Sequence, residues 1–229
     1  MASKVENKKI FEMLADSKTR NAAGYILLGL LLIQLFVLSC LPKDLQTLLF
    51  EISLSIILLV LGLTFIKWQR ILIPLLVTIV ALEFISKFVE LEVFNSILIL
   101  FNIMTLETVI ALYIVQIYRE QKVNTSVILQ AINGYLLLGV ISSLYIVLIL
   151  KYDAGAFSFP DVYDILNIKL GEAQYIGLVT ISTLGYGDIF PVTPIASSIT
   201  TFIAITGQLY VAIIIALLIG KFSSAKQIT

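Results

Sequence analysis

The run at positions 175–188 combines apolar residues with Thr, Ser and Gly, and its last residues are suited to binding an ion. It reads Tyr-Ile-Gly-Leu-Val-Thr-Ile-Ser-Thr-Leu-Gly-Tyr-Gly-Asp. A dehydrated cation needs several oxygen ligands in place of its water, and backbone carbonyls can supply them. Pointing successive carbonyls to one side requires unusual backbone angles at alternate residues, which Gly185 and Gly187 adopt without steric cost. The run therefore indicates a site where main-chain oxygens hold a cation.

The same run resembles the potassium-channel signature Thr-x-x-Thr-x-Gly-Tyr-Gly. The matching residues are Thr180, Thr183, Gly185, Tyr186 and Gly187. The resemblance implies that Thr183, Leu184, Gly185 and Tyr186 bind potassium ions in stacked carbonyl rings, with the Thr183 hydroxyl adding a ring at the inner end. One strand cannot enclose an ion, so the resemblance implies a homotetramer, in which each chain has three further identical subunits as partners. Tyr186 is expected to brace this selectivity filter, residues 183–187, by packing outward.

Residues next to the filter are expected to support it. They are Tyr175, Val179, Thr180, Ser182 and Asp188. Tyr175 stands where the family often has Trp, and Val179 stands where some relatives have a carboxylate. We therefore expect the Asp188 carboxylate to bond the Tyr175 hydroxyl.

A glycine in the last apolar segment is the candidate gate. Gly207 lies twenty residues beyond Gly187, where channels of this family often place a hinge that lets the inner helix bend. The alternative is that Gly207 allows close packing between helices. Three nearby residues are expected to face the cavity or the gate: Thr206, Tyr210 and Ile214.

The composition predicts that membrane helices position these residues. Hydrophobic residues make up 59% of the 229 residues and charged residues only 13%, where a soluble domain has about 25% charged. Six segments reach the roughly 20 residues that a span needs. They are 22–41, 46–66, 71–89, 93–118, 129–150 and 195–220. A seventh run, 172–182, is too short to cross and predicts a re-entrant pore helix. The predicted fold is an all-α membrane protein with six transmembrane helices.

These segments divide the chain into five expected parts. They are a cytoplasmic N-terminal segment (1–21), a four-helix voltage-sensor-like domain (22–118), a cytoplasmic linker (119–128), a pore domain (129–220) and a short cytoplasmic tail (221–229).

Basic residues give the expected orientation. Eleven of the 15 Lys and Arg residues fall in the segments that share a side with both termini. The positive-inside rule therefore predicts a multi-pass protein of the plasma membrane with cytoplasmic termini. The opposite side collects carboxylates, Asp188 among them, and an acidic mouth would concentrate cations.

The fourth span departs from voltage-gated relatives, which carry Arg or Lys at every third position of this helix. Residues 93–118 contain no basic residue before Arg119. We therefore expect little or no voltage gating. Glu107, near the middle of the span, is expected to face a polar interior of the four-helix unit in a structural hydrogen bond. Glu83 and Lys87 are four residues apart on the third span and are expected to pair.

Several function classes lose support. The net charge is zero, which gives no support to a nucleic-acid partner. Histidine is absent, which removes the usual catalytic base and metal ligand, and no enzyme or cofactor other than potassium ions is expected. Two alternatives stay open: a non-selective cation channel on the same fold, and a secondary transporter, which would show inverted repeats.

Overall fold

A computed structural model describes residues 18–65, 69–86, 92–160 and 170–226. The first helix runs over Lys18–Cys40. Its last two turns are irregular, with a π-helical turn, η1 (Ile33–Val37), followed by a 3₁₀ turn, η2 (Leu38–Cys40). Such π turns inside helices are often found at functional sites.

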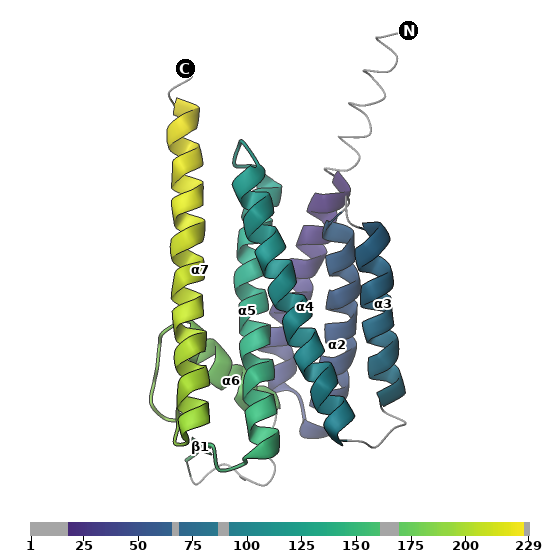
Figure 1. The fold of residues 1–229 in the computed structure, drawn as a ribbon, viewed down its shortest axis with the longest axis vertical. Helices are drawn as coiled ribbons and strands as arrows, with labels where there is room; N and C mark the ends of the chain where they lie inside the picture. Colours follow the sequence, from purple (N-terminus) through teal and green to yellow (C-terminus); the bar gives the residue numbers. More distant parts are fainter. Residues whose placement is uncertain (1–17, 66–68, 87–91, 161–169, 227–229) are drawn as a thin grey trace.

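Three more long helices complete the first half of the chain. They are α2 (Lys43–Thr64), α3 (Gln69–Ser86) and α4 (Glu92–Arg119). Pro42 sits at the N-cap of α2, where its missing N–H costs nothing. Helices α2, α3 and α4 lie in succession beside one another (Figure 1).

The second half contains two long helices around a short one. They are α5 (Thr125–Tyr152), α6 (Leu170–Ile181) and α7 (Pro194–Lys226). Asn124 caps α5, since its side chain accepts a hydrogen bond from the Val127 amide at 3.0 Å. Two short strands, β1 (Phe157–Ser158) and β2 (Phe190–Pro191), form an antiparallel pair. Helix α6 reaches only part of the way along α5 and α7, from the end where β1 lies (Figure 1).

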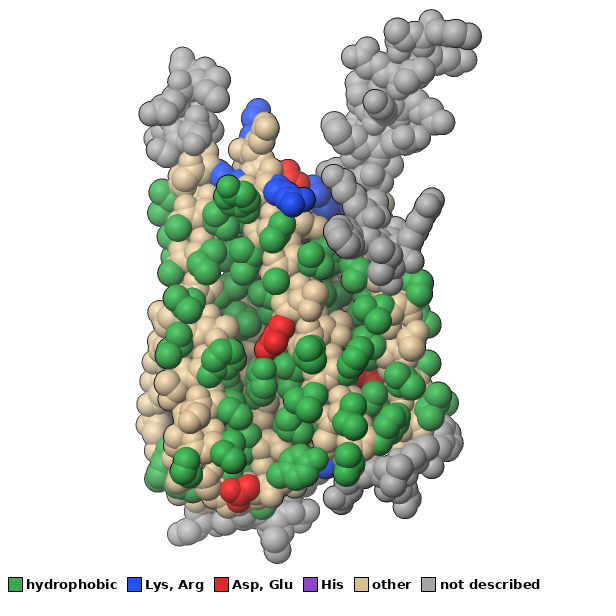
Figure 2. Space-filling model, in the orientation of Figure 1, with side chains coloured by type: hydrophobic (Ala, Val, Ile, Leu, Met, Phe, Trp, Pro, Cys, Tyr) green, Lys and Arg blue, Asp and Glu red, His purple; other side chains and the backbone are tan. Residues whose placement is uncertain are grey.

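The arrangement of the helices agrees with an even number of crossings. The first helix begins and α7 ends at the same end of the bundle (Figure 1). Most of the basic side chains in view gather at that end, and hydrophobic side chains cover the middle of the visible face (Figure 2). A large exposed apolar surface marks contact with a membrane or with other chains.

Four of the described helices are long and apolar enough to cross a membrane: the first helix, α4, α5 and α7. The apolar parts of α2 and α3 are shorter, Leu48–Thr64 and Leu72–Ser86. The expected crossings by α2 and α3 therefore stay predictions. The five expected parts of the chain likewise remain a prediction, although α5 begins at Thr125, four residues before the expected pore domain.

Helix α5 forms the centre of the core. It packs against α4, α6 and α7, and residues such as Leu137, Val140 and Ile146 are completely buried. Helix α4 contributes Leu106, Val109, Ile110 and Tyr113, which have the spacing of one helix face. This core joins the outer helices to the helices that carry the filter.

The acidic residue Glu107 lies on α4 outside this buried face. We expected Glu107 to face the interior of the four-helix unit, but its side chain is exposed and lies against α5. Its carboxylate accepts a hydrogen bond from the Tyr145 hydroxyl on α5, at 2.8 Å. The expectation of a hydrogen bond is confirmed, and the expectation about its position is wrong.

The expected Glu83–Lys87 pair falls partly outside the described residues. Lys87, the expected partner of Glu83, is not among them. Glu83 accepts hydrogen bonds from Ser55 on α2 at 3.0 Å and from Asn102 on α4 at 2.6 Å. It thus links α2, α3 and α4 by hydrogen bonds.

Candidate functional site

The end of α6 sets the start of the filter. Val179 and Thr180 support it through their backbone, because the Val179 carbonyl accepts from the amides of Leu184 at 3.1 Å and Gly185 at 3.4 Å. The Thr180 carbonyl accepts from the Thr183 amide at 3.0 Å. The Ser182 hydroxyl donates to the Leu178 carbonyl at 2.6 Å. The chain therefore leaves α6 in a defined conformation.

Alternate residues of the filter have left-handed backbone angles. The φ values are +59° at Thr183, +54° at Gly185 and +78° at Gly187, and these are the only positive φ angles in the described part of the chain. Alternation of positive and negative φ angles turns successive peptide carbonyls toward the same side. At Thr183 this conformation costs about 1–2 kcal/mol, because it carries a Cβ. Strain of this kind concentrates at functional sites.

The glycines of the filter are required by backbone conformation and not by crowding. A Cβ added at Gly185 or Gly187 would meet no atom within 4 Å. Every residue from Thr183 to Gly187 is exposed in the single chain, with Tyr186 67% exposed. The expected bracing by Tyr186 is therefore not made within one chain and stays a prediction for the assembly.

The outer end of the filter is fixed by one short hydrogen bond. The Tyr175 hydroxyl donates to Asp188 Oδ2 at 2.5 Å, as expected from the sequence. This bond holds the pKa of the exposed Asp188 carboxyl below its ordinary value. Beyond Asp188, the β1–β2 pair and a bond from the Val192 amide to the Ala156 carbonyl (2.9 Å) tie the chain to the segment after α5.

A buried glutamine joins α6 to the first helix. Gln174 Nε2 donates to the Gln34 carbonyl at 2.9 Å, and the Ser39 hydroxyl donates to Gln174 Oε1 at 2.5 Å. Gln174 is only 1% exposed. The π turn η1 contains Gln34, and a π turn frees carbonyls from the regular helical pattern. The sequence analysis missed this contact, although isolated polar residues in apolar segments are a usable signal.

The inner helix crosses the end of α6 at Gly207. A Cβ added there would lie 2.5 Å from the Ile181 carbonyl oxygen, a clash that requires movement of the backbone. Helix α7 is also continuous through this position. Both observations favour close packing over the hinge as the reason for glycine, and the hinge itself stays a prediction.

The side of α7 that faces the filter differs from the expected one. Tyr210 and Ile214 are buried, and the Tyr210 hydroxyl donates to the Ala131 carbonyl on α5 at 2.8 Å. The expectation that they face the cavity is therefore wrong. The exposed residue Gln208 instead reaches the inner end of the filter, with Nε2 3.5 Å from Thr183 Oγ1. Because residues 209–220 of this helix are apolar on every side, the sequence carries little signal for which side of this part faces the pore.

The arrangement can hold a desolvated cation against main-chain oxygens at an exposed edge of one chain. Comparison with protein families agrees with this chemistry: residues 135–224 match the family model described as Ion channel. The matched segment begins in α5 and includes α6, the filter and most of α7. No curated protein and no solved structure matches the chain.

Proposed function

We propose, from the ion-channel domain in residues 135–224, that this chain is one subunit of a potassium-selective channel. The chain is not an enzyme, and its cargo is a cation that crosses a membrane. One observation carries the choice of potassium: the alternating left-handed φ angles at Thr183, Gly185 and Gly187. They supply an uninterrupted ladder of carbonyls that replaces the hydration shell of potassium.

The proposed assembly is a homotetramer with four-fold symmetry. A single filter strand covers only one side of an ion, and the whole strand is exposed in one chain. A closed cyclic arrangement of four copies supplies carbonyls from every side. Gln208 from each chain would then stand beneath the ring of Thr183 hydroxyls.

A non-selective channel is the closest alternative. Filters that lack the full carbonyl ladder lose selectivity in channels that this chain resembles, and here the ladder spans residues 183–187 without a break. A secondary transporter has less support, because the family match is to ion channels and one filter motif is present in the chain.

The outer helices are proposed to act as a structural collar around the pore and not as a voltage sensor. Steep voltage gating takes about 3–4 charges per subunit moving through the field. Helix α4 has no basic residue before Arg119, which lies at its last position. Helices α2 and α3 complete six proposed spans in the plasma membrane, with the basic end of Figure 2 in the cytoplasm.

Three measurements on purified protein test this proposal. Mass measurement in detergent should give a tetramer, and reconstituted vesicles should pass potassium in preference to sodium. A conductance–voltage curve in symmetric potassium should be shallow. A dimer as the largest conducting form would contradict the proposed assembly, and a slope equivalent to several elementary charges would contradict the proposed collar.

A further inference from the structure

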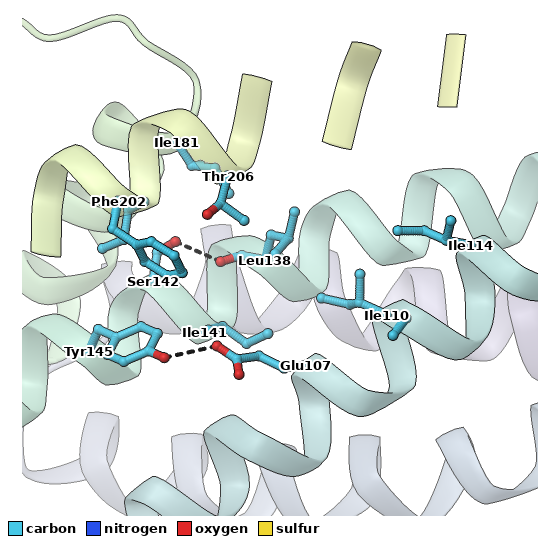
Figure 3. Close-up of a pocket in the computed structure, with 12 residues that line it drawn as sticks. Glu107, Ile110, Ile114, Leu138, Ile141, Ser142, Tyr145, Ile181, Phe202 and Thr206 are labelled. Atoms are coloured by element: carbon cyan, nitrogen blue, oxygen red, sulfur yellow. Dashed lines mark hydrogen bonds between the residues drawn. The ribbon is translucent and has the colours of Figure 1, made fainter. Parts of the chain in front are cut away.

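A lateral cavity of about 260 Å³ lies between α4, α5 and α7, away from the filter strand. Its walls are almost entirely apolar and include Ile110, Leu138 and Phe202 (Figure 3). Ile181, the last residue of α6, also lines the cavity. The cavity therefore touches both the pore helix and the inner helix without being part of the ion path.

One wall of this cavity carries a carboxylate at mid-membrane depth. Glu107 is twelve residues from the end of α4 at Arg119, which corresponds to about 18 Å along the helix. Figure 2 shows an acidic side chain surrounded by hydrophobic ones in the middle of the visible face. An ionisable residue at this depth is costly, so it usually has a functional partner.

The hydrogen bond of Glu107 leaves acceptor capacity unused. The Tyr145 hydroxyl donates to Oε1 at 2.8 Å, and the two side chains point toward one another in Figure 3. A carboxylate has about four lone-pair positions, so one donor leaves most of them available. The Tyr145 and Phe202 rings, 6.5 Å apart and nearly perpendicular, flank the same part of the cavity. Aromatic faces also attract cations.

We propose that this cavity binds an amphiphilic amine from the lipid phase. Its ammonium group would pair with Glu107 beside Tyr145, and its hydrophobic body would lie against Ile110, Leu138 and Phe202. Charge complementarity selects this class of ligand, because a cation next to the carboxylate offsets the cost of an ion in a low-dielectric site. A neutral lipid chain fills apolar space but leaves that cost unchanged.

The proposal concerns binding and does not require that the chain conducts potassium. The test therefore measures ligand binding by fluorine NMR on the full chain in lipid nanodiscs. The probe is para-fluorophenyl-butylamine, and para-fluorophenyl-butanol is its neutral counterpart. Empty nanodiscs give the background from partition into lipid.

Four variants separate the effect of the Glu107 charge from the effect of the free space in the cavity. Glu107→Gln removes the charge and keeps an acceptor for Tyr145, and Glu51→Gln is its control at an exposed carboxylate of α2. Ala111→Phe fills the cavity, and Met104→Phe adds the same ring at an exposed α4 position outside its walls. The amine should bind saturably to the unmodified chain and to both controls.

The two cavity variants should behave differently from their controls. Glu107→Gln should weaken amine binding about tenfold, the loss expected for one hydrogen bond to a charged group. Ala111→Phe should reduce the signal to the empty-nanodisc background. Equal binding of the amine to Ala111→Phe and to the unmodified chain would overturn the site. If the alcohol and the amine bind with equal affinity, and Glu107→Gln does not change that affinity, the charge of Glu107 has no role in binding.

Discussion

The filter end and the proposed cytoplasmic end of the pore are both held by the outer helices, but by different chemistry. At the filter end, Gln174 of the pore helix exchanges two hydrogen bonds with Gln34 and Ser39 of the first helix, in a buried and uncharged contact. At the proposed cytoplasmic end, Lys221 of α7 donates to the Tyr118 carbonyl in the last turn of α4 and to the Glu120 carbonyl directly after it. Arg20 of the first helix pairs with Glu120 at 3.2 Å.

The two contacts should differ in how readily they exchange with water. Breaking a buried hydrogen bond leaves an unsatisfied group and costs about 1–3 kcal/mol. The Arg20–Glu120 pair is partly exposed, with side chains 26% and 35% accessible, and pairs of that kind contribute about 0–1 kcal/mol. Lys221, which ties α7 to this end, is also only partly buried. We infer that the pore helix is fixed in place while the inner end of α7 can move at small cost. Regulated opening would then occur at the cytoplasmic end.

The largest expected effect comes from changing the backbone of the filter itself. Gly185→Ala adds a Cβ at a φ of +54°, a conformation that costs an L-residue about 1–2 kcal/mol in each chain of the proposed tetramer. Potassium current should fall to background while tetramers still form, as checked by single-channel recording and mass measurement. Gly29→Ala, in the first helix where a Cβ meets no atom within 4 Å, is the control. Normal selective current from Gly185→Ala would contradict the carbonyl ladder.

The next largest effect should come from the buried contact at the filter end. Gln174→Leu removes both hydrogen bonds and leaves the Gln34 carbonyl without this donor, at about 1–3 kcal/mol per chain. Single-channel open times should shorten several-fold and the thermal midpoint of the tetramer should drop. Ser39→Ala should have a smaller effect, because it removes only one bond to Gln174. If Gln174→Leu behaves as the unmodified channel, the pore helix is not held from the first helix.

A smaller effect is expected at the proposed cytoplasmic end. Lys221→Met removes the donor that holds α7 against the end of α4. Since α4 lies among the outer helices, losing this contact should let the inner helix move toward the proposed pore axis and lower the open probability. The change should be about fivefold or less, corresponding to at most about 1 kcal/mol. Lys221→Arg keeps a donor and is the control, and an unchanged open probability in Lys221→Met would remove this contact from gating.

The smallest expected effect is a shift in acid sensitivity at the outer mouth. The Tyr175 hydroxyl lowers the pKa of Asp188, so Asp188 stays charged to a more acidic pH than an ordinary aspartate, whose pKa is about 3.9. Tyr175→Phe should raise that pKa, and acidifying the outer solution should then reduce current at a higher pH. Tyr175→Trp supplies an indole N–H donor and should partly restore the profile. Identical acid profiles for Tyr175→Phe and the unmodified channel would show that this bond does not tune Asp188.

The sequence predicted the parts of the molecule in which residue identity dictates backbone conformation. Gly185 and Gly187 located the filter because few other residues accept positive φ angles, and the short run before them located α6. The side of α7 that faces the filter was predicted wrongly for Tyr210 and Ile214, since residues 209–220 are apolar all round and have no polar stripe to mark the faces of the helix. The contact of Gln174 with Gln34 depends on a π turn, which shifts the helix faces and has no sequence signature.

The central claim is that the carbonyl ladder of residues 183–187 selects potassium. The most direct test is the reversal potential of single channels in a planar bilayer, with potassium on one side and sodium on the other. We expect a reversal potential close to the potassium equilibrium potential, because sodium does not replace potassium in the carbonyl rings. A reversal potential near zero would contradict the account and identify a non-selective cation channel.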